Sequence, residues 1–251
     1  MKLKVFILSL MLVQPLSAQK IFDIVKTNDH RALKEYNGPV NLRDTNQATP
    51  LMWAIYRSDL TMVKQLIKKG ADVTMKGWIR FTDPESNFEF IYGSCLAVAA
   101  GEGNKDIVKY LLDKEHIPIE DKEINFHQNI DNGWNALQWA SVKGHNDLVN
   151  YLVRKGANIN APAQTDMNQT PLILAIIFGN AETAILLAEL GADVNQRDDY
   201  GVAPLTYAFE LQSKELVKVL IEHGAFFPDT NGSQLKDLLN DYFDVENTED
   251  L

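Results

Sequence analysis

Two clusters of side chains could bind a metal ion, one of histidines and acids and one of acids alone. His116 and His127 lie in the stretch 114–132 among several acids, and a second acidic cluster lies within residues 193–199. The acids are Glu120, Asp121 and Glu123 in the first cluster and Asp193, Asp198 and Asp199 in the second. The histidine spacing matches no known ligand pattern, and a solvated turn accounts for the second cluster. We therefore expect surface polar residues here and no metal site.

Groups that could do catalysis are equally sparse. The single cysteine, Cys95, excludes an internal disulfide and is expected to be a small half-buried residue rather than a reactive thiol. Gly101-Glu102-Gly103 is half of a dinucleotide fingerprint but has no strand before it. The chain contains no nucleophile elbow, phosphate loop or His-Glu-x-x-His motif. The sequence predicts a protein that is not an enzyme and has no catalytic residues and no cofactor; hydrolase activity that survives stringent purification would support the opposite hypothesis.

Residues 1–18 have the composition of a secretory signal peptide. Lys2 and Lys4 precede the apolar run 5–13, and the small residues Ser17 and Ala18 come before Gln19. The apolar run is too short to cross a bilayer, which takes about 20 residues. We expect export to the periplasm or the outside of the cell, with cleavage after Ala18 and no membrane insertion afterwards; a buried first helix is the alternative.

Charge limits the class of partner. The chain has 34 acidic and 24 basic residues, and loss of Lys2 and Lys4 leaves 34 against 22, a net charge of −12. Nucleic-acid affinity depends largely on lysines and arginines that neutralise phosphates, so we expect no nucleic-acid partner. A basic protein partner is favoured if charge matters, although solubility alone explains the composition.

The secondary structure of the chain can be predicted from a short sequence motif that occurs five times. The motif is Thr49-Pro50-Leu51 or a variant of it, and its leucines are separated by 45, 41, 35 and 33 residues, so a unit of about 33 carries insertions. The other copies are Ser94-Cys95-Leu96, Asn135-Ala136-Leu137, Thr170-Pro171-Leu172 and Ala203-Pro204-Leu205. A capping residue followed by proline predicts the start of a helix.

A second helix follows each of these starts. Its apolar stripe at i, i+1, i+4 and i+5 is clearest in Leu148, Val149, Leu152 and Val153. Asn104, Asn180 and Ser213 are expected to cap such helices, and glycines end them. These glycines are Gly70, Gly156, Gly191 and Gly224.

These motifs resemble ankyrin repeats, most closely in Gly144-His145-Asn146-Asp147-Leu148-Val149, Gly191-Ala192-Asp193-Val194-Asn195 and Thr170-Pro171-Leu172. The resemblance implies an all-α solenoid of about six helix-turn-helix repeats with short β-turn or hairpin fingers, over residues 19–243. Because the signal-like segment precedes it, we expect an exported bacterial member of the family. The histidine that usually follows Thr-Pro-Leu is replaced in every unit, which puts its hydrogen bonds between turns in doubt. The replacements are Met52, Ala97, Gln138, Ile173 and Thr206.

The two ends and the two insertions depart from the repeat. A degenerate first unit is expected from Ile21 to Tyr36, a capping helix at 234–243 and an acidic flexible tail at 244–251. Residues 78–92 predict a β-hairpin, since two β-prone runs flank a turn-forming cluster. Its aromatic rings could contact a partner or fold onto the neighbouring unit, and the sequence leaves both open. The second insertion is 114–132.

The resemblance implies that the finger turns and the ends of the first helices form one surface, the concave face. Counting from each leucine places on it Tyr56, Arg57, Glu102, Trp134, Val142, Lys143, Met167, Ile177, Phe178, Tyr200, Glu210 and Leu211. The mixture of aromatic and apolar residues with few charges suits a protein partner. The predicted partner-binding residues, from this face and the hairpin, are Tyr56, Arg57, Trp78, Phe81, Phe88, Phe90, Tyr92, Trp134, Lys143, Phe178 and Tyr200.

We therefore expect a non-catalytic, exported scaffold or accessory protein that binds a partner through these residues. An inhibitor or immunity protein that neutralises a basic toxin or enzyme is the alternative.

Overall fold

The computed structural model describes residues 16–82, 89–121, 133–163 and 167–226. Within these ranges the chain forms twelve helices, which pair in sequence order as six antiparallel units, and one two-stranded hairpin. The first helices of the units are α1 (Leu16–Lys26), α3 (Pro50–Tyr56), α5 (Cys95–Gly101), α7 (Ala136–Val142), α9 (Pro171–Ile177) and α11 (Pro204–Glu210). The second helices are α2 (His30–Glu35), α4 (Leu60–Lys68), α6 (Lys105–Asp113), α8 (Asn146–Arg154), α10 (Ala181–Glu189) and α12 (Lys214–Glu222). The predicted all-α solenoid of about six repeats is confirmed.

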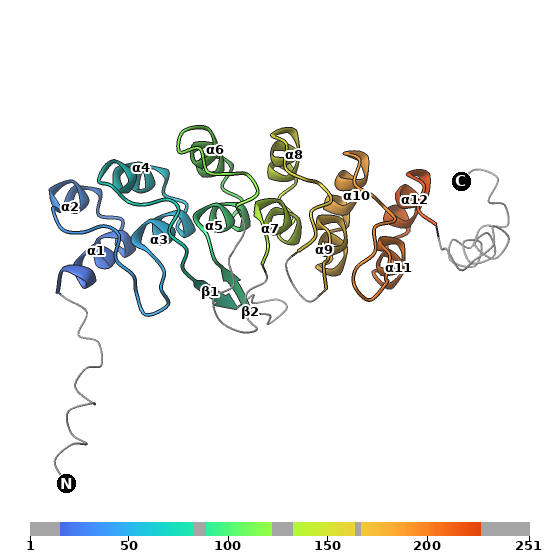
Figure 1. Ribbon diagram of the computed structural model, residues 1–251, viewed down its shortest axis with the longest axis horizontal. Coiled ribbons are helices and arrows are strands. Elements are labelled where there is room, and N and C mark those ends of the chain that lie inside the picture. The colour runs from blue at the N-terminus through green and yellow to red at the C-terminus, as the bar shows by residue number, and fades with distance from the viewer. Residues whose placement is uncertain (1–15, 83–88, 122–132, 164–166, 227–251) are drawn as a thin grey trace, which may run out of the picture.

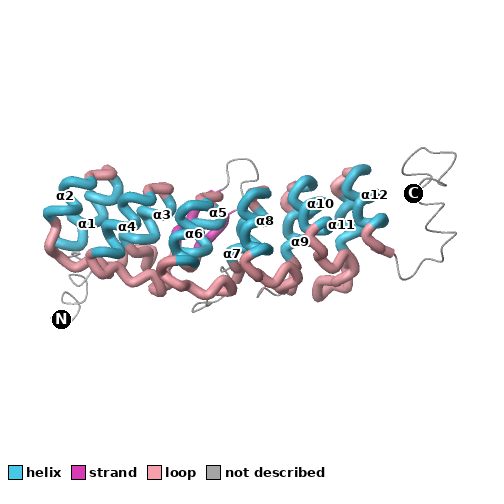
Figure 2. Tube along the Cα trace, turned by 90° about the horizontal axis from the view of Figure 1, so that it is seen from above, coloured by secondary structure: helices cyan, strands magenta, loops and turns pink. Residues whose placement is uncertain are grey.

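The units stack side by side into an elongated body. Figure 1 shows the even-numbered helices in one layer, the odd-numbered helices in a second layer, and the finger loops below them. The view from above in Figure 2 shows the same single row. Each odd-numbered helix packs against its neighbours in the series from α1 to α11. The concave face is therefore carried by an unbroken row of first helices. None of the helices in the described ranges has the length and apolar run that a membrane crossing requires.

Local capping explains why the first helices begin where they do. The hydroxyls of Thr49, Ser94 and Thr170 accept hydrogen bonds from backbone N–H groups of the first helical turn, at 3.2, 3.1 and 3.3 Å. Proline occupies the first helical position of α3, α9 and α11, where its missing N–H costs nothing. The helix starts predicted from the repeated motif are confirmed.

Gln138 takes the position of the missing family histidine in α7. Its Oε1 accepts from Asn135 N at 2.8 Å while Asn135 Oδ1 accepts from Gln138 N at 2.9 Å, which completes a capping box. Its Nε2 donates to the carbonyl of Ala161 in the next finger at 2.8 Å. A glutamine thus links two successive units here without a histidine.

The second helices end as predicted but do not all begin as predicted. Gly70, Gly156, Gly191 and Gly224 have φ values of 90°, 93°, 91° and 86°, which glycine adopts without strain. Asn104 and Ser213 cap α6 and α12 through their side chains.

Asn180 precedes α10 without capping it, so that prediction was wrong. Its Nδ2 instead donates to the carbonyl of Val142 at 2.7 Å and lies 3.3 Å from that of Ser141. These carbonyls lie at the C-terminal end of α7 in the preceding unit, so the amide links two consecutive units instead of capping its own helix.

The insertion at 78–92 forms the predicted hairpin. Strands β1 (Ile79–Thr82) and β2 (Glu89–Tyr92) are antiparallel, with Ile79 opposite Tyr92 and Phe81 opposite Phe90. The degenerate first unit is also present as α1 and α2, with Ile21, Val25 and Leu33 buried. The predicted capping helix at 234–243 and the tail at 244–251 lie outside the described residues, as do residues 1–15.

Candidate protein-binding face

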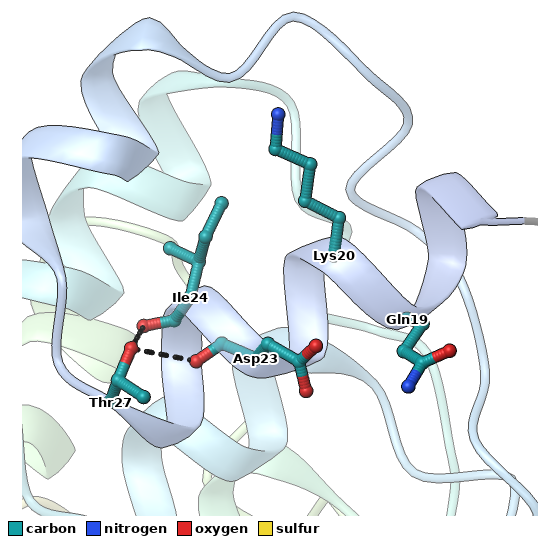
Figure 3. A pocket seen from close by; sticks show the side chains of 5 residues that line it. All are labelled: Gln19, Lys20, Asp23, Ile24 and Thr27. Carbon is teal, nitrogen blue, oxygen red and sulfur yellow. Dashed lines mark hydrogen bonds between the residues drawn. The ribbon is translucent and has the colours of Figure 1, made fainter.

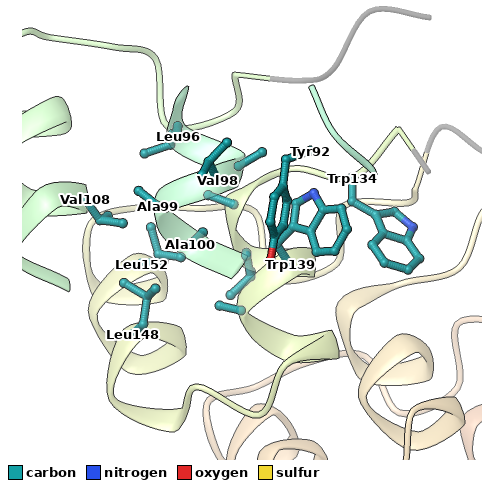
Figure 4. Packing of buried hydrophobic residues seen from close by; sticks show 14 of the residues in the cluster. Tyr92, Leu96, Val98, Ala99, Ala100, Val108, Trp134, Trp139, Leu148 and Leu152 are labelled. Carbon is teal, nitrogen blue, oxygen red and sulfur yellow. The ribbon is translucent and has the colours of Figure 1, made fainter. Parts of the chain in front are cut away.

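Tyr92 lies in the core of the molecule, so its assignment to a binding surface was wrong. Its side chain is 0% exposed, and its ring packs on Trp139 of α7 with centroids 4.4 Å apart at 62°. Figure 4 shows both rings beside the apolar side chains of α5 and α8. The last residue of β2 points into the stack, so the hairpin is anchored to the neighbouring unit by burial.

Trp134 is buried as well, which corrects a second prediction. It is 4% exposed and makes edge-to-face contacts with Trp139 at 4.8 Å and with Phe178 at 5.6 Å. Val142, also expected on the concave face, is 4% exposed. Phe178 itself is half-buried and closes this aromatic row from the side of α9. Tyr92, Trp139, Trp134 and Phe178 thus form one row beneath the centre of the concave face.

A half-buried carboxylate lies beside this row. The hydroxyl of Tyr92 donates to Glu102 Oε1 at 3.0 Å. The pKa of Glu102 is raised overall, because the effect of burial exceeds the opposite effects of the Tyr92 hydrogen bond and the charge of Lys143. Lys143 is half-buried, and its role in binding a partner stays a prediction. The centre of the face therefore offers one acidic and one basic side chain above an aromatic base.

The N-terminal part of the face contains the predicted pair Tyr56 and Arg57. Tyr56 is half-buried with its ring against Trp53, at 5.7 Å and 87°. Arg57 is exposed, and its Nε donates to Asn28 Oδ1 of the first unit at 3.1 Å. An aromatic ring and a guanidinium are therefore adjacent at the end of α3.

The hairpin residues are only partly placed by the structure. Trp78 is half-buried, just before β1. Phe81 and Phe90 are opposite one another in the ladder, and their side chains lie outside the described part, as does all of Phe88. Of the two hypotheses for the hairpin, inward packing holds for Tyr92, and outward contact with a partner stays a prediction for the other rings.

The C-terminal part of the face contains the most exposed apolar side chains of the described face. Met167, Ile177 and Tyr200 are 39%, 40% and 70% exposed. Met167 and Ile177 line a hollow of about 470 Å³ between α9 and α11. Its other lining residues are Gln169, Ile176, Tyr207, Glu210 and Leu211. None of the residues that line this hollow was among the partner-binding residues predicted from the sequence. Counting from each leucine had placed four of its residues on the concave face, which is the signal that could have found it.

The acids considered as metal ligands have structural roles where the structure describes them. Asp198 is buried and accepts from Tyr200 N, Val202 N and the Tyr207 hydroxyl, at 3.0, 2.9 and 2.6 Å. Burial and this last hydrogen bond raise the pKa of Tyr207 above its usual range. Within the described ranges no group of three or more His, Cys, Asp or Glu side chains could hold a metal ion. The acid cluster at 193–199 thus shapes a finger turn.

Two acids of the second insertion, 114–132, have similar roles. Glu120 accepts from Asn135 Nδ2 at 2.9 Å and from Asn158 N at 2.7 Å. Asp121 pairs with Lys76 Nζ at 2.5 Å. His127 lies outside the described residues. These acids link consecutive units.

Cys95 is more deeply buried than the half-buried position expected from the sequence. It is fully buried, and this burial raises the pKa of its thiol to about 12, although Lys76 acts in the opposite direction. At neutral pH the group is a protonated thiol, whereas the reactive form is the thiolate.

A second hollow lies at the N-terminal end of the row, along α1. Figure 3 shows its lining by Gln19, Lys20, Asp23, Ile24 and Thr27 of the first unit. The Thr27 hydroxyl donates to the carbonyl of Asp23 at 2.8 Å, just after the C-terminal end of α1. Its lining is that of a polar end surface, as expected for the first unit of a solenoid.

Comparison with known proteins agrees with this architecture. The family described as "Ankyrin repeats (3 copies)" matches residues 82–163 and 161–231, and the single "Ankyrin repeat" matches residues 46–78. The chain superposes on the human ASB11 ankyrin repeat domain with a TM-score of 0.64 and 20% identity, over 88% of each chain. For an ankyrin repeat domain from Acinetobacter baumannii the TM-score is 0.61 at 24% identity, over 82% of this chain and 98% of that one.

Curated relatives are similar over part of their length. A Danio rerio protein that carries the name palmitoyltransferase ZDHHC13 is 30% identical over 69% of this chain. Alpha-latrocrustotoxin-Lt1a of Latrodectus tredecimguttatus is 33% identical over 53% of this chain. The matches cover 24% and 8% of the length of those two proteins.

Proposed function

Because the chain belongs to the ankyrin-repeat family, whose repeats mediate protein–protein interaction and whose fold is typically a non-catalytic scaffold, we propose that it is an exported protein-binding module. It acts as a scaffold or accessory protein and binds a partner protein through the concave face. The observation that carries the proposal is the row of first-helix ends, on which aromatic, apolar and charged side chains are accessible from Tyr56 to Tyr200. Such a composition is typical of protein interfaces.

Site-specific photo-crosslinking in the native cell tests this proposal, because it captures whichever protein lies against the labelled position. A photoreactive phenylalanine analogue is placed at Tyr56, Ile177 or Tyr200 on the concave face. The matched controls carry it at Tyr110 and Lys218, on second helices of the opposite layer. We expect adducts of one defined mass at the concave positions only. Adducts at the control positions alone, or at none of the positions, would reject the concave face as the binding surface.

Export is the second part of the proposal. It is supported by the charged, apolar and small-residue order of residues 1–18. Cleavage after Ala18 removes three residues of α1 and leaves Ile21, Ile24 and Val25 to bury their side chains in the first unit. Fractionation of the native cell with N-terminal sequencing is expected to yield Gln19 as the first residue, in the periplasm or the medium. An intact Met1 in the cytosol would reject export.

An inhibitor or immunity protein directed at a basic toxin or enzyme is the alternative role. The net charge of −12 after loss of residues 1–18 supports it, because a strongly acidic surface speeds encounter with a basic partner. The identity of the photo-crosslinked adduct separates the two roles. If this protein is an inhibitor, adding it to the purified partner should abolish the activity of that partner. If it is a scaffold or accessory protein, the activity should be preserved or stabilised.

A further inference from the structure

Charge is distributed unevenly along the solenoid axis. Residues 19–78 contain ten bases and six acids, a net charge of +4, whereas residues 167–226 contain three bases and eight acids, a net charge of −5. Because the units stand in a single row, this polarity in the sequence becomes a polarity in space (Figure 2). A partner bound along the row meets an electropositive N-terminal end and an electronegative C-terminal end.

The accessible apolar surface coincides with the electronegative end. The hollow of about 470 Å³ between α9 and α11 has Met167 and Ile177 in its wall, and both are more than a third exposed. Half-buried Leu211 completes the apolar wall from α11. A hollow of this size accommodates a large apolar side chain, and removing one from water is a main source of interface affinity.

Acidic side chains border the hollow. Glu210 lies in its lining and is exposed. Asp199 is exposed in the adjacent finger, where its N–H donates to the Met167 carbonyl at 3.1 Å. The cation of this finger, Arg197, donates to the carbonyl of Gly201 at 2.5 Å. The Asp199 carboxylate also accepts from Asn168 Nδ2 at 2.8 Å, a neutral donor that leaves its negative charge in place. The rim therefore has two exposed carboxylates beside an apolar floor.

The geometry points to this hollow as the anchor site for a partner segment in which a large apolar side chain is flanked by lysine or arginine. The inference rests on the proposed function, because it names the chemistry that the concave face recognises. The apolar side chain enters between Met167 and Ile177, and the flanking cations approach Glu210 and Asp199. Charge complementarity selects this occupant over an acidic segment, which the same rim repels.

Methyl NMR of the full chain with defined peptides tests the inference. The probes are the N-acetylated tripeptide amides Arg-Leu-Arg, Glu-Leu-Glu and Arg-Gly-Arg, at millimolar concentration. We expect Arg-Leu-Arg to shift the methyl signals of Met167 and Ile177 saturably and to bind about tenfold more tightly than either other peptide, since each lacks one of the two contacts. Absence of binding, equal affinity for the three peptides, or shifts confined to other methyl groups would overturn the inference.

Four variants sharpen the test. In the variants, binding is followed on the signals of the peptide, because Met167→Ala with Ile177→Ala removes the two reporter methyl groups. This double variant should weaken Arg-Leu-Arg binding about tenfold, whereas Phe226→Ala, which removes a 52% exposed ring outside the hollow, should leave it unchanged. Glu210→Lys should weaken Arg-Leu-Arg and favour Glu-Leu-Glu. Glu222→Lys on α12 makes the same charge change away from the hollow and should do neither. Equal effects of each variant and its control would overturn the inference, while adducts at Tyr56 would still support the proposed function.

Discussion

The Tyr92 ring lies 4.4 Å from the Trp139 ring, centroid to centroid, and the two meet at 62°. This contact joins the last residue of the hairpin to the first helix of the fourth unit. The adjacent backbone is shaped to admit it: a Cβ at Gly101 would lie 2.2 Å from the Tyr92 ring, so only glycine fits at the end of α5. The hairpin insertion is therefore part of the stack through Tyr92, together with the buried side chain of Ile79.

Tyr92→Ala should destabilise the protein by about 3 kcal/mol, because it removes a fully buried ring and leaves a cavity beside Trp139. Urea denaturation measures the change. Trp78→Ala is the matched control, since Trp78 is an aromatic residue of the same insertion that remains half-buried. Equal losses of unfolding free energy in the two variants would contradict the structural role of Tyr92.

Gln138→Ala should cost about 1–3 kcal/mol, because it leaves the Asn135 N–H and the Ala161 carbonyl without their buried partner. Thr206→Ala tests the same repeat position in the sixth unit, where the residue is half-buried, and should change the unfolding free energy by less than about 0.5 kcal/mol. Thermal and urea unfolding of both variants give the comparison. A Gln138→Ala variant as stable as Thr206→Ala would show that the link between the units is dispensable.

Cys95 should resist thiol reagents in the native state at pH 8 and react at once in denaturant, because only the unfolded chain exposes an ionisable thiol. The folded pKa of about 12 exceeds the ordinary thiol value of 9.0, so unfolding releases a proton between these pH values. The contribution of the buried protonated thiol to the free energy of unfolding is therefore fully present below pH 9 and is lost as the pH rises towards 12. In Cys95→Ala this component is absent, so its unfolding free energy should fall less steeply over that interval. Rapid native labelling at pH 8 would contradict the burial.

The repeat architecture could be predicted from sequence because its signals are local. Thr49, Ser94 and Thr170 cap helices within their own four residues, and Gly156 ends a helix through its own backbone angle. These helix ends can therefore be predicted without knowing how the unit packs against its neighbours.

The errors arose where a neighbouring unit decides the outcome. Asn180 has the chemistry of a cap, but carbonyls of the preceding unit take its amide. Tyr92 was placed on the surface as a hairpin aromatic and Trp134 by counting from a leucine. Both rings instead pack on Trp139, which depends on how the hairpin and the finger lie against α7. The hollow at Met167 and Ile177 likewise exists only because α9 and α11 stand next to each other.

The affinity of the partner identified by photo-crosslinking for three forms of the purified chain tests the central claim most directly. The forms are the wild type, a concave-face variant with Tyr56→Ala, Arg57→Ala and Lys143→Ala, and a control with Lys64→Ala, Lys109→Ala and Lys218→Ala on the second helices. Binding through the concave face predicts that the first variant loses at least about tenfold in affinity while the control stays within about twofold of wild type. Loss of affinity in the control, with the concave-face variant unchanged, would contradict it.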